Sequence, residues 1–331
     1  MRIQSGPIVV ILFLTLALNG CGDKKASSET SIKEVKVPVF NADSAYRLIE
    51  RQVAFGPRIP NSPSHRQTGD FIAATLKKYG ARVIEQTFEA KTFDAQKLSL
   101  RNIIGSFNPD KQKRIILAAH WDTRPFSDKD AEFPDKPFDG ANDGGSGVGV
   151  LLEVARLMSQ QSPEVGVDMI FFDGEDWGER DKEDGTVPRP EGLDSWWCLG
   201  SQYWAKHKHK PAYRAHYGIL LDMVGGKDAR FFRDASSVVY AAPIVEKVWN
   251  TAARLGYGPQ FIKHTEEAIV DDHLFVNELG NIQMIDITPF EPGVGYFGSF
   301  HHTQRDNMNI ISRETLNMVG RVVVQVLYEE E

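Results

Sequence analysis

Short apolar runs alternate with amphipathic stretches along the chain, and the two patterns predict different elements. Apolar runs predict strands at residues 82–88, 97–105, 114–119, 167–172, 217–221 and 281–287. Apolar residues repeated at helical spacing predict helices at residues 41–55, 64–79, 145–160, 242–255 and 313–328. Strands that alternate with helices are typical of a mostly parallel sheet covered on both faces. The sequence therefore predicts an α/β fold of three layers, α/β/α, with a mostly parallel mixed sheet, in one catalytic domain at residues 36–331.

The first residues predict an export signal rather than a part of the fold. Pro7 to Leu18 is an apolar run too short to span a bilayer comfortably, and the sequence LNGC follows, ending at Cys21. LNGC resembles the lipobox of bacterial lipoproteins, in which the cysteine is lipidated. The alternative is an ordinary signal peptide with a chance cysteine. We expect a signal peptide at 1–20, a flexible tether at 21–35 and a lipid on Cys21. That lipid would hold the protein to a membrane of a bacterial cell envelope, on the periplasmic or outer-membrane side.

The composition of the chain excludes several classes of protein. The 331 residues carry a net charge of −7 and no basic stretch, so we expect no nucleic-acid partner. Two cysteines cannot form a disulfide framework. If Cys21 carries lipid, Cys198 is the remaining thiol. Its position between Trp197 and Leu199 predicts a small, buried, apolar role rather than catalysis.

Residues that can bind metal follow three of the predicted strands. They are His120 after 114–119, Glu175 and Asp176 after 167–172, and Asp222 after 217–221. The carboxyl ends of the strands form the binding crevice of an open α/β sheet, so we expect these side chains at one edge. Asp143, at the start of the next helix, and His302, before the last helix, complete a set of imidazoles and carboxylates that suits Zn²⁺.

A metal site accounts for this pattern better than helix caps, a nucleotide site or a serine nucleophile. A single aspartate after a strand is commonly a helix cap, but a whole set at successive strand ends is hard to explain as caps. The glycine-rich segment 144–149 lacks both a following Gly-Lys-Ser/Thr and the Rossmann spacing, so it does not predict a nucleotide site. No Gly-x-Ser-x-Gly elbow is present, which disfavours a serine hydrolase.

Six motifs occur in the order and spacing of the M28 zinc aminopeptidase superfamily. They are AAHWDTRP, GANDGGSGVGVLLEVAR, FFDGEDWG, LLDMVGG, VDDH and FHHTQRDN, and the resemblance covers nearly all of residues 40–330. Within the superfamily, the HWD, FFDGE and DDH motifs are most similar to those of glutaminyl-peptide cyclotransferases. The segment WCLGSQYWA at residues 197–205 resembles the bacterial members of that group. The resemblance implies the fold of the zinc exopeptidases.

The resemblance also implies a set of metal ligands. Asp143, Asp176 and His302 match the ligands of the zinc that the cyclases retain. His120 and Asp222 match the outer ligands of a second zinc in dinuclear peptidases, with Asp143 as the bridge. One zinc is therefore expected and two are possible. Asp176 stands where a glutamate is common, so the shorter side chain requires a small shift of the backbone.

Further roles follow from the same resemblance. Glu175 matches the general base, and Asp222 and Asp271 match carboxylates that form hydrogen bonds near that base. The expected substrate pocket consists of Trp121, Trp196, Trp197 and His301. His301 replaces a tryptophan of the animal cyclases, so the shape of this pocket is expected to differ from theirs.

These features predict an enzyme that acts on the amino terminus of peptides or proteins. The first expectation is a glutaminyl-peptide cyclotransferase, which converts an N-terminal glutamine to pyroglutamate and releases ammonia. The alternative is a zinc aminopeptidase, which would use the same residues. The tryptophans favour the cyclase, because a small neutral side chain needs a tight aromatic pocket. A non-catalytic metal-binding protein is disfavoured, because Glu175 and all the matched ligands are present.

Overall fold

The computed structural model describes residues 36–180 and 187–331. Residues 35–331 form one compact unit. The predicted signal peptide, the tether and Cys21 lie outside the described residues. No helix in the described part of the chain has the length and apolar character needed to cross a membrane.

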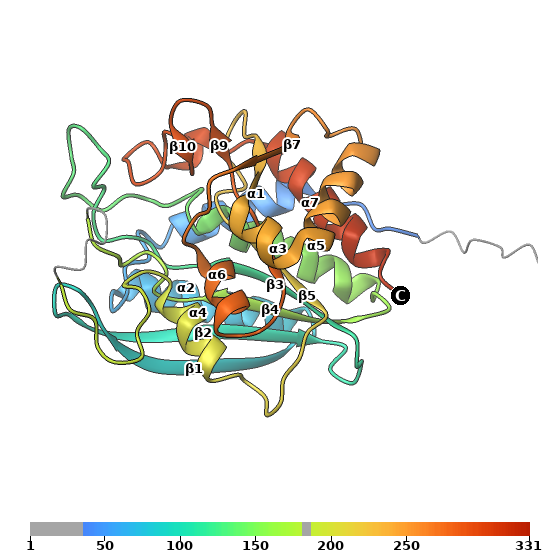
Figure 1. Ribbon diagram of the computed structural model, residues 1–331, viewed down its shortest axis with the longest axis horizontal. Coiled ribbons are helices and arrows are strands. Elements are labelled where there is room, and N and C mark those ends of the chain that lie inside the picture. The colour runs from blue at the N-terminus through green and yellow to red at the C-terminus, as the bar shows by residue number, and fades with distance from the viewer. Residues whose placement is uncertain (1–35, 181–186) are drawn as a thin grey trace, which may run out of the picture. The chain divides into compact units, whose positions relative to one another are not determined.

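Six strands form the central sheet, in the order β1–β2–β4–β3–β5–β8 (Figure 1). They are β1 Arg82–Lys91, β2 Lys97–Phe107, β3 Arg114–His120, β4 Gly166–Phe172, β5 Tyr217–Leu221 and β8 Met284–Ile287. β4, β3, β5 and β8 are parallel, whereas β1 and β2 form an antiparallel pair at one edge. Every residue of β3, β4 and β5 is buried, as their continuous apolar sequences predict. The predicted mostly parallel mixed sheet is confirmed.

Helices cover both faces of this sheet. One apolar core lies between the sheet and α1 Ala42–Val53, α2 Pro63–Lys78, α3 Gly145–Gln160, α5 Ala235–Arg254 and α7 Arg313–Tyr328. A smaller core, on the other face, includes residues of α4 Leu199–Lys206 and α6 Asp272–Glu278. Successive residues of a strand face opposite sides, so Ile115 of β3 joins the first core and Ile116 the second. The three-layer α/β/α prediction is confirmed.

Several short elements were not predicted. They are α4, α6, β6 Phe231–Asp234, β7 Phe261–Glu266, β9 Phe290–Glu291, β10 Gly295–Tyr296 and a 3₁₀ turn at Met308–Ile310. Each is too short to show a clear hydrophobic period. The helix predicted at 242–255 begins earlier, at Ala235, where the Asp234 side chain accepts a hydrogen bond from the Ser237 N–H. Pro243 inside the helix and the non-helical backbone at Ala241 explain why the sequence pattern indicated a later start.

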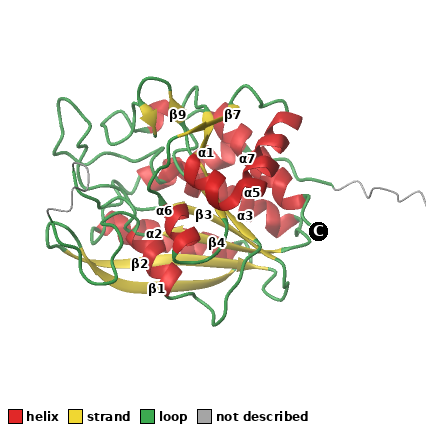
Figure 2. Ribbon diagram, in the orientation of Figure 1, coloured by secondary structure: helices red, strands yellow, loops and turns green. Residues whose placement is uncertain are grey.

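Long irregular segments follow the strands that carry the candidate residues. Residues 121–144 follow β3, and residues 173–180 and 187–198 follow β4; none of them forms a helix or strand. Figure 2 shows these and other loops in green, concentrated on the side of the domain away from the C-terminus. Residues 178–180 and 187–194 are likewise irregular.

A buried ion pair links two strands of the sheet. Arg114 of β3 donates to both carboxylate oxygens of Asp168 on β4, at 2.6 and 2.8 Å. Burial opposes the ionisation of Asp168. Hydrogen bonds from Arg114, Ser106 and Tyr213 outweigh that effect and lower the pKa of Asp168 below its ordinary value. The pair is therefore charged and fully hydrogen-bonded within the core.

We expect Asp168→Ala to lower the free energy of unfolding by about 3–5 kcal/mol, because it leaves the Arg114 guanidinium buried without its partner. Asp70→Ala is the matched control. The Asp70 side chain is 73% exposed and that of its partner Arg101 is 18% exposed, so this ion pair is open to solvent. The control should cost less than about 1 kcal/mol. Urea unfolding of the two variants gives both numbers. Equal losses of unfolding free energy in the two variants would contradict a stabilising role for the buried Arg114–Asp168 pair.

Candidate metal centre

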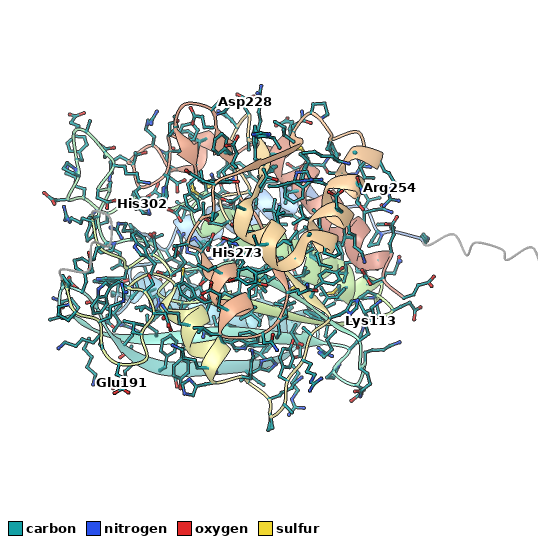
Figure 3. The ribbon with its side chains drawn as sticks, in the orientation of Figure 1. Lys113, Glu191, Asp228, Arg254, His273 and His302 are labelled. Carbon is teal, nitrogen blue, oxygen red and sulfur yellow. The ribbon has the colours of Figure 1, made fainter. Side chains whose placement is uncertain are left out.

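The proposed metal ligands come from five places in the sequence and meet at one edge of the sheet. His120 ends β3, Asp176 follows β4 and Asp222 follows β5. Asp143 precedes α3, and His302 lies in the loop before α7. Each of the five is 6% exposed or less. In Figure 3, His302 lies among the loops, and His273 lies in the interior, whereas Lys113 and Arg254 lie at the periphery.

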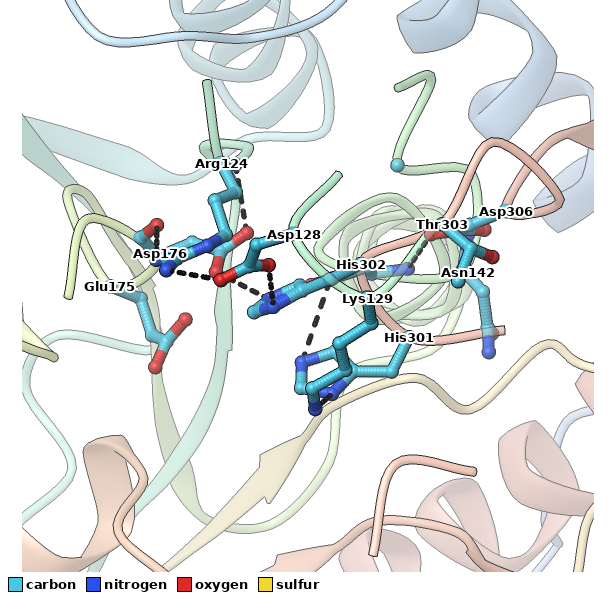
Figure 4. A network of polar contacts seen from close by, with 12 residues as sticks. Arg124, Asp128, Lys129, Asn142, Glu175, Asp176, His301, His302, Thr303 and Asp306 are labelled. Atoms are coloured by element: carbon cyan, nitrogen blue, oxygen red, sulfur yellow. Dashed lines mark hydrogen bonds and ion pairs between the residues drawn. The ribbon is translucent and has the colours of Figure 1, made fainter. Parts of the chain in front are cut away.

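The first group of donors consists of His302, Asp176 and Asp143. His302 Nε2 lies 2.8 Å from Asp176 Oδ1 and 3.7 Å from Asp143 Oδ2 (Figure 4). Two donors at about 2.1 Å from a tetrahedral ion are about 3.4 Å apart. In the described part of the chain, the group of donors within 4.8 Å of one another contains Asp143, His302 and His301, and not Asp176. A zinc ion held by Asp143, Asp176 and His302 would therefore need these side chains to move.

The second group consists of His120, Asp143 and Asp222. His120 Nε2 lies 3.1 Å from Asp143 Oδ1 and 3.1 Å from Asp222 Oδ1. Asp143 thus directs one oxygen to each histidine, which is the arrangement expected of a bridging ligand. The geometry therefore offers two adjacent metal positions that share Asp143.

The electrostatics of the site also fit a cation. Asp143 Oδ2 is buried and has no hydrogen-bond donor. Burial raises the pKa of Asp176 and of Asp222 above the ordinary range for aspartate. Keeping such carboxylates charged is costly unless a positive ion is present. Imidazole and carboxylate donors with this spacing suit Zn²⁺.

Two carboxylates outside these groups lie beside the Nδ1 atoms of the histidines. Asp128 Oδ1 lies 3.1 Å from His302 Nδ1, which leaves Nε2 for a metal (Figure 4). Asp122 Oδ1 lies 3.6 Å from His120 Nδ1, which is too far for a hydrogen bond. Asp122 also accepts hydrogen bonds from the backbone N–H groups of Glu175 and Asp176, at 3.1 and 3.2 Å. Sequence reasoning missed Asp128, because nothing in an irregular loop indicates which residue reaches the site.

A buried arginine and a buried aspartate hold the loop that carries Asp143. Arg58 donates to the carbonyl oxygens of Asp143 and Gly140, at 2.9 and 2.6 Å. Asp306 accepts hydrogen bonds from the N–H groups of Asn142 and Asp143, at 2.7 and 3.0 Å. Both residues were absent from the sequence-based site, since each acts through the backbone and is distant in sequence.

A cavity of about 470 Å³ opens beside the metal ligands. Its lining includes six residues of the predicted site, namely Asp143, Glu175, Asp222, Trp197, His301 and His302. Glu179 and Arg180, from the irregular segment that follows β4, also line the cavity. The Trp197 ring lies nearly parallel to the His302 ring, with centroids 6.0 Å apart, and forms one wall.

The pocket prediction requires correction for two tryptophans. Trp121 is fully buried and stacks on His65, with ring centroids 4.3 Å apart, so it belongs to the core. Trp196 is 3% exposed and does not line the cavity. Trp121 follows β3 directly and packs in the core, whereas Trp197 packs against His302 from the segment before α4.

His301 lines the cavity and also lies near the first group of metal donors. Its Nε2 lies 4.0 Å from Asp143 Oδ2, and donors of Asp143, His301 and His302 could together surround an ion. However, Lys129 Nζ lies 2.6 Å from His301 Nδ1 and donates to it (Figure 4). A neutral imidazole that accepts at Nδ1 carries its proton on Nε2, which then cannot bind a metal. His302 is therefore the better ligand of the two.

Glu175 and Asp271 lie close together at the inner end of the site. Donor atoms of Glu175, Cys198 and Asp271 lie within 4.8 Å of one another. Burial raises the pKa of Glu175 well above its ordinary value, and the charges of Asp176 and Asp271 add to the effect. Burial, followed by the charge of Asp222, raises the pKa of Asp271 to about 6. Two carboxylates with raised pKa values beside a metal centre are typical of acid–base catalysis.

Residues 102–327 match peptidase family M28, and the chain belongs to that family. A glutaminyl cyclase from Bacteroides thetaiotaomicron, solved with N-acetylhistamine, is 46% identical, with a TM-score of 0.85 over 89% of this chain and 100% of that one. A glutaminyl cyclase from Tannerella forsythia is 48% identical, with a TM-score of 0.84 and the same coverage. A zinc-dependent exopeptidase from Parabacteroides distasonis is 50% identical, also with a TM-score of 0.84 and that coverage.

A more distant relative of this chain is an aminopeptidase. The aminopeptidase YwaD of Bacillus subtilis is 26% identical over 290 residues, which are 82% of this chain and 54% of that protein. The chain thus spans about half the length of this relative. The predicted resemblance to the M28 superfamily and to its bacterial glutaminyl cyclases is confirmed, as are the exopeptidase-like fold and the zinc cofactor.

We expect Asp143→Ala and His302→Ala each to abolish bound zinc, because each removes one of few protein ligands. His301→Ala should retain zinc and change only the affinity for substrate. Elemental analysis of the dialysed variants measures zinc per chain. Loss of zinc from the His301 variant, with zinc retained in the His302 variant, would reverse the assignment of these neighbouring histidines.

Proposed function

We propose that this chain is a zinc-dependent glutaminyl-peptide cyclotransferase, with peptide or protein amino termini as its substrates. The observation that carries the proposal is the 46–48% identity to two solved bacterial glutaminyl cyclases over 89% of the chain. The cavity supports it, because a volume of about 470 Å³ with Trp197 as a wall suits a short side chain and the first residues of a peptide.

The reaction joins two parts of one glutamine residue. The α-nitrogen forms a bond to the carbon of the side-chain amide, and the bond from that carbon to the amide nitrogen breaks. Ammonia leaves, and no water is consumed. Asp143, Asp176 and His302 would hold the zinc ion, which when bound would supply a Lewis acid for the side-chain carbonyl.

Glu175 moves the proton in this proposal. Its carboxylate accepts a proton from the attacking α-amine and gives one to the departing amide nitrogen. The raised pKa of Glu175, caused first by burial, makes it a stronger base than an exposed glutamate. Asp271 lies beside this base, and its charge adds to the effect of burial in raising the pKa of Glu175.

Peptide-bond hydrolysis is the second candidate function. The pairing of His120 with Asp143 and Asp222 offers a second metal position, which a dinuclear aminopeptidase would need. In that reaction, Glu175 would take the proton from an attacking water. The products separate the two functions, since cyclisation releases ammonia and hydrolysis releases a free amino acid.

A lipid anchor at Cys21 is a further part of the proposal. The apolar run 7–18 and the LNGC sequence at 18–21 support a bacterial lipoprotein held on the periplasmic or outer-membrane side of the cell envelope. Polar residues 22–35 would then serve as a tether between lipid and enzyme.

Cys21→Ala should move the protein from the membrane fraction to the soluble fraction, or block its processing, because the lipid provides the attachment. Fractionation of bacterial cells that express the full chain tests this. Cys198→Ala is the matched control and should remain with the membranes. An unchanged distribution of the Cys21 variant would exclude the anchor.

We expect Glu175→Gln to lower turnover of a glutaminyl peptide by roughly 10²–10⁴-fold, because it preserves size but removes the proton acceptor. Zinc content and thermal stability should change little. The assay measures ammonia from a glutaminyl peptide and amine from an aminoacyl chromogenic substrate, so it also decides between the two functions.

Glu89→Gln is the control for this exchange, since the Glu89 side chain is 62% exposed on β1. Its turnover, zinc content and thermal stability should equal those of the parent. If Glu175→Gln instead loses its zinc and keeps its activity per bound metal, Glu175 is a ligand and the roles of Glu175 and Asp176 must be exchanged.

A further inference from the structure

The thiol of Cys198 contacts the carboxylate of Glu175. Cys198 Sγ donates to Glu175 Oε1 at 3.2 Å. The backbones of the two segments are also joined, because Cys198 N–H donates to the Glu175 carbonyl at 2.8 Å and Leu199 N–H to the Gly174 carbonyl at 3.0 Å. The start of α4 is thereby fixed against the loop that carries the proposed base.

The backbone around this contact is unusual at two positions. Cys198 has φ = 59°, a left-handed conformation that costs free energy for a residue other than glycine. At Gly200, a Cβ atom would lie 2.4 Å from the Asp173 carbonyl oxygen, so only glycine permits this close approach. Both features bring α4 towards the residues that follow β4 and direct the Cys198 side chain to Glu175.

The side chain of Cys198 does not serve the helix that it precedes. Cys198 is the N-cap residue of α4, yet it makes no capping hydrogen bond. Serine, threonine, aspartate or asparagine is preferred at that position, because its oxygen accepts from the first turn of the helix. The thiol instead points to a catalytic carboxylate, so helix capping does not explain the residue.

Glu175 has few other partners for its carboxylate. Among residues 36–180 and 187–331, Cys198 Sγ is the one donor within hydrogen-bond distance of it. The nearest imidazole nitrogen, His120 Nδ1, is 3.9 Å from Oε2. Burial raises the pKa of the Cys198 thiol well above its usual range, so the group is an S–H donor. Oε1 is therefore held, while Oε2 has no donor in the described part of the chain.

We propose that Cys198 is a positioning residue, whose S–H group holds Oε1 of Glu175 so that Oε2 is presented to the proton of the substrate. The inference rests on the proposed role of Glu175 as the general base. It also revises the expectation of a purely apolar role for Cys198. A misdirected base transfers protons less well even when substrate and metal are bound normally.

Replacement of Cys198 by alanine and by serine tests the proposal. Alanine and serine both carry a Cβ atom, so each has the same strain as cysteine in the left-handed backbone at position 198. Only serine keeps a hydrogen-bond donor in its side chain. In Cys198→Ala, kcat should fall about tenfold, the size expected when one orienting hydrogen bond is lost, with KM and zinc content unchanged. Cys198→Ser should restore kcat to within about threefold of the parent.

Cys198→Gly is a second donor-free variant that suits the left-handed backbone. It should keep the melting temperature near that of the parent and show the same fall in kcat as the alanine variant. Equal losses in the alanine and serine variants, or a parental kcat in either donor-free variant, would overturn the proposal.

A double-mutant comparison identifies the residue through which Cys198 acts. In the Glu175→Gln background, Cys198→Ala should cause no further loss of kcat, because the base is already absent. An additional tenfold loss would place the effect of Cys198 elsewhere. Ammonia and amine release from the parent are measured in the same assays, so a parent that only hydrolyses peptides refutes the proposed function, while the comparison still tests Cys198.

Discussion

Mutual repulsion among buried carboxylates is the constraint on which this structure depends. The parallel strands β4 and β5 end at the same edge of the sheet, with Glu175 and Asp176 after β4 and Asp222 after β5. Glu175 and Asp222 line one cavity together with Asp143. None of the aspartates in this group is more than 6% exposed. Like charges packed together at low dielectric destabilise a fold unless cations or shared protons offset them. A metal ion held by the aspartates would offset that repulsion and would supply a Lewis acid at the site.

Asp143 is the residue that joins the site together. One of its oxygens faces His302 and the other faces His120, so its position determines the distance between the two possible metal ions. Arg58 and Asp306 fix the backbone on both sides of it, which explains why two charged residues are retained deep in the protein. The precision of the site thus comes from hydrogen bonds to the backbone as much as from the ligands themselves.

The sequence revealed the sheet and the ligands for the same physical reason. β3, β4 and β5 are buried on both faces, so their apolar runs are unbroken, and a polar residue at the end of such a run is conspicuous. His120 and Asp222 could be recognised in this way. The short elements α4 and α6 could not, because one or two turns do not show a period.

The sequence could not predict the site residues whose positions depend on the conformation of a loop or on the packing of neighbouring side chains. Asp128 reaches His302 from an irregular segment, and Arg58 acts through carbonyl groups distant in sequence. The sequence predicted both Trp121 and Trp197 in the substrate pocket. In the structure, Trp121 stacks on His65 in the core, and Trp197 lines the cavity. The direction of a side chain at a strand end is set by the packing around it, which the sequence pattern does not contain.

Anomalous diffraction at the zinc edge, from crystals of the full chain purified without chelators, tests the central claim most directly. The account predicts a zinc peak within bonding distance of Asp143, Asp176 and His302, at about 2.0–2.2 Å from each donor. A second, weaker peak beside His120 and Asp222 is compatible with the shared position of Asp143. A protein that converts glutaminyl peptides at its full rate with no zinc peak at these three residues would contradict the account.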